Sequence, residues 1–86
     1  MNSLDCIETN QRSYRPKLLK VLGHRIRSLR REQGLSQEAL GEKAGLHRTY
    51  ISSLENGSRN VSILTLASVA ASLDVKIRDL CQGIDS

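Results

Sequence analysis

The segment from Arg48 to Asn60 carries most of the side chains that could recognise another molecule. Its sequence, RTYISSLENGSRN, combines hydroxyl, amide and guanidinium groups with only two large aliphatic side chains, Ile51 and Leu54. These two are three residues apart, so on a helix they share one stripe and leave the polar groups on the opposite side. Such a helix can be anchored along one edge while it presents hydrogen-bond donors and acceptors along the other.

No arrangement of residues along the chain indicates catalysis or metal binding. We find no Ser–His–acid or Cys–His arrangement, no phosphate-binding loop and no ligand cluster, and neither histidine has metal-spaced neighbours. Cys6 and Cys81 stand at opposite ends, where Cys6 is expected to be a free thiol and Cys81 a buried one. A chain of 86 residues rarely builds both a deep pocket and a catalytic apparatus. We predict no enzymatic activity, no metal and no cofactor.

Positive charge is concentrated in the first part of the chain. The formal net charge is +4, and the first 35 residues carry eight Lys and Arg against three acids. This favours a polyanionic partner, either nucleic acid or a membrane surface, although a solvated basic face would give the same composition. The start MNSLDCIETN lacks the features of a secretory signal, and no stretch approaches the ~18 apolar residues of a membrane span. We therefore predict a reduced, cytoplasmic protein that does not enter the membrane.

Apolar periodicity predicts an all-α chain with one domain. Residues 1–16 show neither helical nor strand periodicity and are expected to form a flexible N-terminal arm. Pro16 suits the first turn of the next helix, where a missing N–H costs nothing. A domain over residues 17–82 follows, and residues 83–86 form a C-terminal tail. Helices are expected from Lys17 to Gln33, Ser36 to Ala44, Arg48 to Glu55, Ser62 to Leu73 and around Val75 to Leu80. Lys76 is a poor capping residue, so the last helix is expected to fray.

Two glycines mark a corner between the second and third predicted helices. Gly41 inside a helix costs roughly 1 kcal/mol relative to Ala, which is explained if another helix passes closely there. Gly45 permits the positive φ that a tight turn requires. Five apolar positions surround them in register: Leu40, Ala44, Leu46, Ile51 and Leu54. Together these residues predict a helix-turn-helix at about residues 37–55.

The stretch QEALGEKAGLHRTYISSL, together with the ENGSRNVSI that follows it, resembles the Cro/repressor (Xre) class of helix-turn-helix regulators. The resemblance covers about residues 20–82. Within it, LHRTYISSLENGSRNVSI is particularly similar to the controller proteins of restriction–modification systems. The resemblance implies a compact five-helix, lambda-repressor-like domain whose third helix enters the major groove of double-stranded DNA.

The same resemblance implies roles for individual residues. Base contacts would come from Arg48, Thr49 and Ser53. Contacts to the DNA backbone, or mixed contacts, would come from Gln37, His47, Tyr50, Ser52, Arg59 and Asn60, with Gln37 holding a phosphate at the head of the second helix. His47 departs from the Ser or Thr common in phage repressors, so its role as cap or DNA contact stays open. Arg30 and Glu55 match a pair that often forms an interior ion pair in the family. Alternatively, Arg48 is an ordinary surface residue and Arg59 only interacts with a helix C-terminus.

These residues predict a sequence-specific DNA-binding transcriptional regulator that binds a palindromic operator as a homodimer. The dimer surface is expected from the C-terminal region, where a short helix cannot bury all of its apolar groups alone. Those groups are Val75, Ile77, Leu80 and Ile84. No small-molecule effector is expected. The alternative is a protein-interaction module, such as an antitoxin of a toxin–antitoxin pair that also regulates its own operon.

Overall fold

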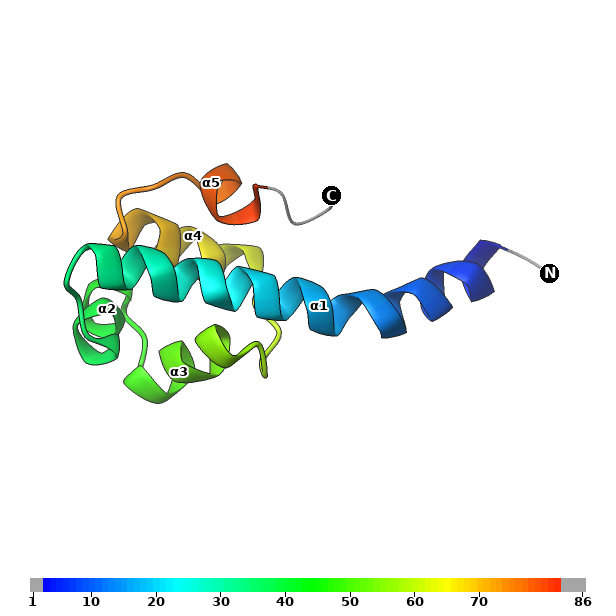
Figure 1. The fold of residues 1–86 in the computed structure, drawn as a ribbon, viewed down its shortest axis with the longest axis horizontal. Coiled ribbons are helices and arrows are strands. Elements are labelled where there is room, and N and C mark those ends of the chain that lie inside the picture. The colour runs from blue at the N-terminus through cyan, green and yellow to red at the C-terminus, as the bar shows by residue number, and fades with distance from the viewer. Residues whose placement is uncertain (1–2, 83–86) are drawn as a thin grey trace.

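Five α-helices form the part of the chain that the computed structural model describes, which is the backbone of residues 3–82 and the side chains of residues 17–82. They are α1 (Ser3–Glu32), α2 (Gln37–Ala44), α3 (Arg48–Asn56), α4 (Ile63–Ser72) and α5 (Ile77–Cys81). The all-α prediction is confirmed. Figure 1 shows α1 running the length of the molecule, with α3 on one side of it and α5 on the other. No described helix is both long enough and apolar enough to cross a membrane.

The first helix begins much earlier than the sequence indicated. Instead of an irregular arm over residues 1–16 and a helix start at Pro16, α1 begins at Ser3 and continues through the proline. A proline inside a helix removes one backbone hydrogen bond and strains the preceding turn. An established helix, however, gains one hydrogen bond for each residue added to its end. The extension therefore needs no apolar face, which is why apolar periodicity did not reveal it. Residues 1–2 and the predicted tail over 83–86 lie outside the described residues.

The core is aliphatic and joins all five helices. Helix α1 packs against α3 and α5, α2 packs against α3 and α4, and α4 packs against α5. The buried apolar side chains are Leu22, Ile26, Leu40, Ile51, Leu54, Leu66, Val69, Ala70, Leu73 and Leu80. Fully burying a Leu, Ile or Val side chain contributes about 1.5–3 kcal/mol relative to leaving it exposed. Burial of these residues therefore fixes how α3 sits on the rest of the domain.

The last helix departs from the sequence-based expectations in three ways. It is capped at its start, because the Asp79 carboxylate accepts a hydrogen bond of 2.9 Å from the backbone N–H of Lys76. Its end is held by Arg25 of α1, which donates to the carbonyl oxygens of Asp79 and Gln82 at 2.9 and 2.7 Å. Leu80 points into the core with no exposed surface, and Cys81, expected to be buried, is exposed. Hydrogen bonds at both ends and the burial of Leu80 thus hold α5 on the rest of the domain.

Candidate nucleic-acid interface

The turn between α2 and α3 is tight and is built around two glycines. Gly45 ends α2 with φ 72°, in the left-handed region that other residues rarely adopt. Gly41 lies against the backbone carbonyl of Leu46, and the N–H of Leu46 donates to the Gly41 carbonyl at 2.8 Å. A Cβ at position 41 would overlap the Leu46 carbonyl oxygen. The element that passes close to Gly41 is therefore the turn before α3. The helix-turn-helix corner therefore has both the conformation and the spacing that its glycines indicated.

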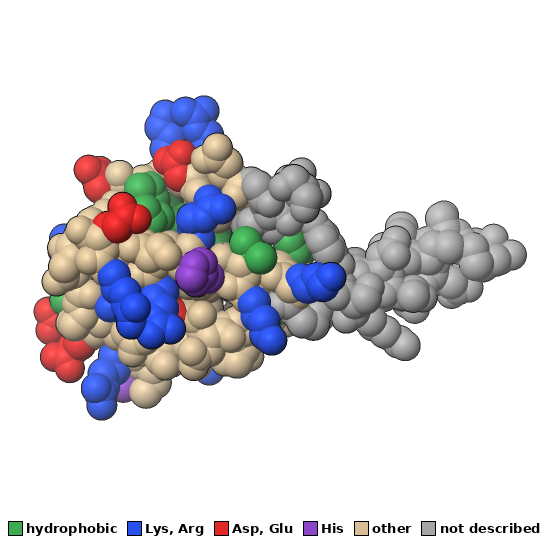
Figure 2. Space-filling view, in the orientation of Figure 1, with side chains coloured by type: hydrophobic (Ala, Val, Ile, Leu, Met, Phe, Trp, Pro, Cys, Tyr) green, Lys and Arg blue, Asp and Glu red, His purple; other side chains and the backbone are tan. Residues whose placement is uncertain are grey.

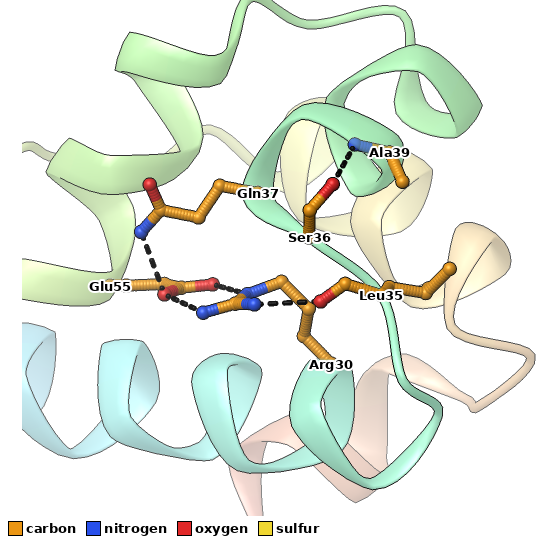
Figure 3. Close-up of polar contacts among 6 residues, drawn as sticks. All are labelled: Arg30, Leu35, Ser36, Gln37, Ala39 and Glu55. Atoms are coloured by element: carbon orange, nitrogen blue, oxygen red, sulfur yellow. Dashed lines mark hydrogen bonds and ion pairs between the residues drawn. The ribbon is translucent and has the colours of Figure 1, made fainter.

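A buried ion pair ties α1 to the end of α3. Arg30 Nε lies 2.6 Å from Glu55 Oε2, and Arg30 Nη2 lies 3.0 Å from Glu55 Oε1. The two residues are 8% and 7% exposed. The hydrogen bond to Glu55 and the charge of its carboxylate raise the pKa of Arg30, against the opposing effect of burial. Arg30 also donates to the Leu35 carbonyl at 2.7 Å, so the loop before α2 joins the same cluster, as Figure 3 shows.

Gln37, expected to hold a phosphate, turns its side chain towards the interior. Its Nε2 donates to Glu55 Oε1 at 3.1 Å and thereby links the first turn of α2 to the ion pair (Figure 3). One amide hydrogen is therefore committed to the fold. Its second amide hydrogen and the backbone N–H groups of Gln37 and Glu38 remain as donors for an anion, whereas the N–H of Ala39 donates to Ser36 Oγ at 2.9 Å.

His47 caps α3. Its Nδ1 accepts a hydrogen bond of 3.1 Å from the backbone N–H of Thr49, and its backbone is extended, with φ −70° and ψ 148°. An imidazole thus takes the place of the short hydroxyl or amide that usually caps a helix. At the other end, Gly57 terminates α3 in the left-handed conformation. Caps at both ends compensate for the short length of this helix.

The outward side of α3 carries the side chains expected to reach base edges. Arg48 and Thr49 are exposed, Ser52 and Ser53 are half-buried, and Ile51 on the opposite side is fully buried. Helix α3 is therefore anchored by its inner stripe and open along its outer side, as the sequence of this segment suggested.

A second group of candidate residues lies just beyond α3. Arg59 and Asn60 are exposed in the segment between α3 and α4. The Arg59 guanidinium lies over the half-buried Tyr50 ring, with Cζ 4.6 Å from the ring centroid, a cation–π arrangement. Tyr50 also packs against the core, so it connects the cation to the body of the domain.

The three predicted dimer residues that the structure describes do not form an exposed apolar surface. Leu80 is buried, Val75 and Ile77 are half-buried against the core, and Ile84 lies outside the described residues. Among the described side chains, the most exposed large aliphatic ones are instead Ile63 and Leu64 at the start of α4, 65% and 78% exposed.

Two residues that the sequence reading missed help to position the site. Gly23 of α1 lies against the carbonyl oxygens of Leu54 and Glu55, where any side chain would collide with the end of α3. Like Gly41, Gly23 is a glycine inside an amphipathic helix, which is a signal in the sequence for the close approach of another element. Arg25 gave no signal, because its partners are backbone carbonyls more than fifty residues away.

Basic side chains lie on the same face of the molecule as α1. Figure 2 shows several Lys and Arg side chains on this face, with most of the acidic groups towards its edge. The exposed cations of α1 among the described side chains are Lys17, Lys20, Arg27 and Arg31. A positive field of this kind attracts a polyanion from a distance and weakens with added salt.

Comparison with known proteins agrees with this geometry. The helix-turn-helix family model matches residues 26–80. The control protein C.MunI from a Mycoplasma species is 41% identical over 64 residues, which cover 73% of this chain and 86% of that protein.

Solved structures show the same likeness. The restriction–modification controller protein C.AhdI from Aeromonas hydrophila superposes with a TM-score of 0.71 and 44% identity, over 72% of this chain and 94% of that one. The biofilm regulator SinR, solved in complex with DNA, superposes with a TM-score of 0.66 and 43% identity, over 69% and 95%. The chain therefore belongs to the helix-turn-helix family of DNA-binding transcriptional regulators, of the Cro/repressor (Xre) type, and is similar to the controller proteins of restriction–modification systems.

Proposed function

We propose that this protein is a sequence-specific regulator that binds a palindromic operator as a homodimer, with α3 in the major groove. The observation that carries the proposal is the two-sided character of α3. Its inner residues Ile51 and Leu54 are buried, and its outer residues Arg48 and Thr49 are exposed at the N-terminal end. The first residues of a recognition helix are those that contact base edges in this family of domains.

Base reading is assigned to Arg48, Thr49 and Ser53. The Arg48 guanidinium can donate two parallel hydrogen bonds to O6 and N7 of guanine. Contacts with phosphate or with the flank of a base are assigned to Gln37, His47, Tyr50, Ser52, Arg59 and Asn60. Because the Gln37 amide already donates to Glu55, its backbone N–H and its second amide hydrogen are the groups that would meet a phosphate.

The homodimer follows from the amount of sequence that one recognition helix can read. One helix spans only a few base pairs, which gives little selectivity against the competing sites of a genome. Two copies spaced by about 34 Å, one turn of duplex, would double the site. The apolar pair Ile63 and Leu64 supports a contact between the copies that avoids the reading residues at the start of α3.

Two arginine variants test the proposal. After selection of bound duplexes from a random pool, Arg48→Ala should weaken binding to the selected site by about 1–3 kcal/mol and relax the preference at one base pair per half-site. Arg59→Ala should weaken binding to selected and to random DNA alike. It should also make the negative slope of log K against log salt shallower by about one.

The control is Arg78→Ala, which removes an exposed arginine from α5 on the other side of α1 (Figure 1). Its binding to both DNAs should match that of the wild type. An unchanged ratio of selected to random affinity in Arg48→Ala would show that this residue does not read bases.

A further inference from the structure

Two hydroxyl groups on α3 donate hydrogen bonds to other groups of the protein itself. Thr49 and Ser53 are four residues apart and therefore lie on the same side of the helix. The Ser53 hydroxyl is 2.9 Å from the backbone carbonyl oxygen of Thr49. A carbonyl oxygen can only accept, so the Ser53 O–H is the donor in this bond. The lone pairs of Ser53 Oγ are what remain for another molecule.

The Thr49 hydroxyl is committed by a different partner, His47. The Nδ1 of His47 accepts the backbone N–H of Thr49, so this nitrogen carries a lone pair and the ring proton is on Nε2. Thr49 Oγ1 lies 2.8 Å from the same Nδ1. Because Nδ1 then has no hydrogen to give, the Thr49 O–H is the donor in this contact, and it shares the single lone pair of Nδ1 with the backbone N–H. The histidine therefore caps the helix and also fixes the direction of the neighbouring hydroxyl.

We propose that Thr49 and Ser53 act as hydrogen-bond acceptors towards DNA and read exocyclic amino groups. The inference rests on the proposed function, in which α3 enters the major groove. There the amino donors are N6 of adenine and N4 of cytosine, and the oxygen acceptors are O6 of guanine and O4 of thymine. To bond an oxygen acceptor, either hydroxyl must first give up its internal hydrogen bond, whereas an amino group is accepted without rearrangement.

The same end of α3 also carries a group that can only donate hydrogen bonds. The Arg48 guanidinium has five N–H donors and no acceptor, so it selects oxygen and nitrogen acceptors such as those of guanine. With Thr49 next to it, the first turn of α3 presents donors at one residue and acceptors at the following one. Each half-site should therefore place a guanine contacted by Arg48 near an adenine or cytosine contacted by Thr49.

The first step of the test locates the base pair that Thr49 reads. Bound duplexes are selected from a random pool with the wild-type protein and with Thr49→Val, which keeps the branched shape and removes the hydroxyl. We expect one base pair per half-site to lose its preference in the variant. If the wild-type protein enriches no sequence, the proposed function itself fails. If it enriches a site and Thr49→Val changes no position, only the assignment to Thr49 is overturned.

The second step identifies which atom of that base pair is contacted, since every base pair offers both an amino group and an oxygen. Duplexes are made with purine in place of adenine, or with pyrimidin-2-one in place of cytosine, so that only the amino group is lost. The wild type should lose about 2- to 10-fold more affinity on this change than Thr49→Val does, the usual effect of one hydrogen bond. If the excess loss appears instead on removing O4 of thymine or O6 of guanine, Thr49 donates and the proposal is wrong. Ser53→Ala is examined in the same way at its own base pair.

The third step tests the part played by His47. His47→Asn keeps an acceptor that can take both hydrogen bonds from Thr49, and it should retain the dependence on the amino group. His47→Ala removes that acceptor, so the Thr49 hydroxyl becomes free to donate as well as to accept, and the variant should bind duplexes with an amino group or with an oxygen acceptor at that position about equally well. Thermal unfolding of both variants measures the loss of the helix cap separately from this readout. An undiminished preference for the amino group over an oxygen acceptor in folded His47→Ala would overturn the role of the histidine.

Discussion

At the scale of single residues, the cluster of Arg30, Glu55 and Gln37 determines where the end of α3 lies. Arg30 uses three donors, two on Glu55 and one on the Leu35 carbonyl, and Glu55 accepts a further bond from Gln37. No buried side-chain nitrogen or oxygen among the described residues lacks a partner. A buried pair of this kind offsets its desolvation only while both charges are present.

Removing one member of the pair should therefore be worse than removing both. Arg30→Met or Glu55→Leu alone should lower the free energy of unfolding by about 3–5 kcal/mol, because each strands a buried charge. The double variant should lose less than either single one. Urea unfolding of the three proteins measures the difference, and near-neutral single variants would show that the pair is solvated.

The contact between Tyr50 and Arg59 predicts that the ring positions the guanidinium to bind a DNA phosphate. Tyr50→Phe keeps the ring and should bind random DNA nearly as the wild type does. Tyr50→Leu should lose about 0.5–1 kcal/mol of random-DNA affinity, the usual worth of an exposed cation–π contact. Titrations at low salt give these values. In an Arg59→Ala background the Tyr50→Leu change should cost less than it does in the wild type, because only the contact of Tyr50 itself with DNA is then lost, and an equal loss in the two backgrounds would refute the coupling.

At the scale of elements, α3 exists because its neighbours hold it. A helix of nine residues is marginal on its own in water, so caps and packing must supply its stability. His47 and Gly57 close its two ends. Two glycines on other helices, Gly23 and Gly41, let the last turn of α3 come close to α1 and the turn that precedes α3 come close to α2. The orientation of the outer side of α3 therefore depends on the absence of a side chain at these two positions.

Filling that space should destabilise the domain. Gly23→Leu and Gly41→Leu should each lower the free energy of unfolding by about 1–3 kcal/mol, because the new side chain meets backbone oxygens that cannot move aside alone. The better helix propensity of Leu offsets only part of this loss. Ala71→Leu, which adds bulk at an exposed position of α4, is the control and should leave the melting temperature nearly unchanged. Melting temperatures equal to the wild type in the glycine variants would contradict the close packing.

At the scale of the whole molecule, apolar surface at the start of α4 remains uncovered in a single chain. Ile63 and Leu64 are mostly exposed, so neither side chain is buried in the core of the domain. The surface first expected to join two copies, around Leu80, is used to complete the core of one copy. The proposed two-fold assembly is therefore better supported by the beginning of α4 than by α5.

Leu64→Glu should weaken the dimer. Two-fold symmetry buries the side chain twice, so its replacement should cost about 3–6 kcal/mol per dimer. Sedimentation at tens of micromolar should show a dimer for the wild type and a shift towards monomer for the variant. Ala71→Glu, which adds the same charge at an exposed position on the same helix, should not shift the equilibrium. A wild type that stays monomeric would refute the dimer, and a dimer unaffected by Leu64→Glu would refute this surface.

The sequence by itself determined the all-α fold and much of the core. The period of its apolar residues showed which face of each helix turns inward, as for Ile26, Leu40 and Ile51. The glycines at 41 and 45 indicated the corner, and family resemblance indicated that Arg30 and Glu55 would meet, which they do. These features were accessible because they depend on local periodicity, on backbone conformation or on a recurring pattern.

Only the tertiary structure decided what covers each face and where each polar group finds its partner. Periodicity marks Leu80 as apolar, but whether the same chain or a second copy covers it depends on how α5 folds back. The length of α1 was hidden because a helix can extend without any apolar stripe. Gln37 turns inward because Glu55, on another helix, lies within hydrogen-bond distance of its amide. Such pairings depend on distances of a few ångströms between elements, which local sequence patterns do not encode.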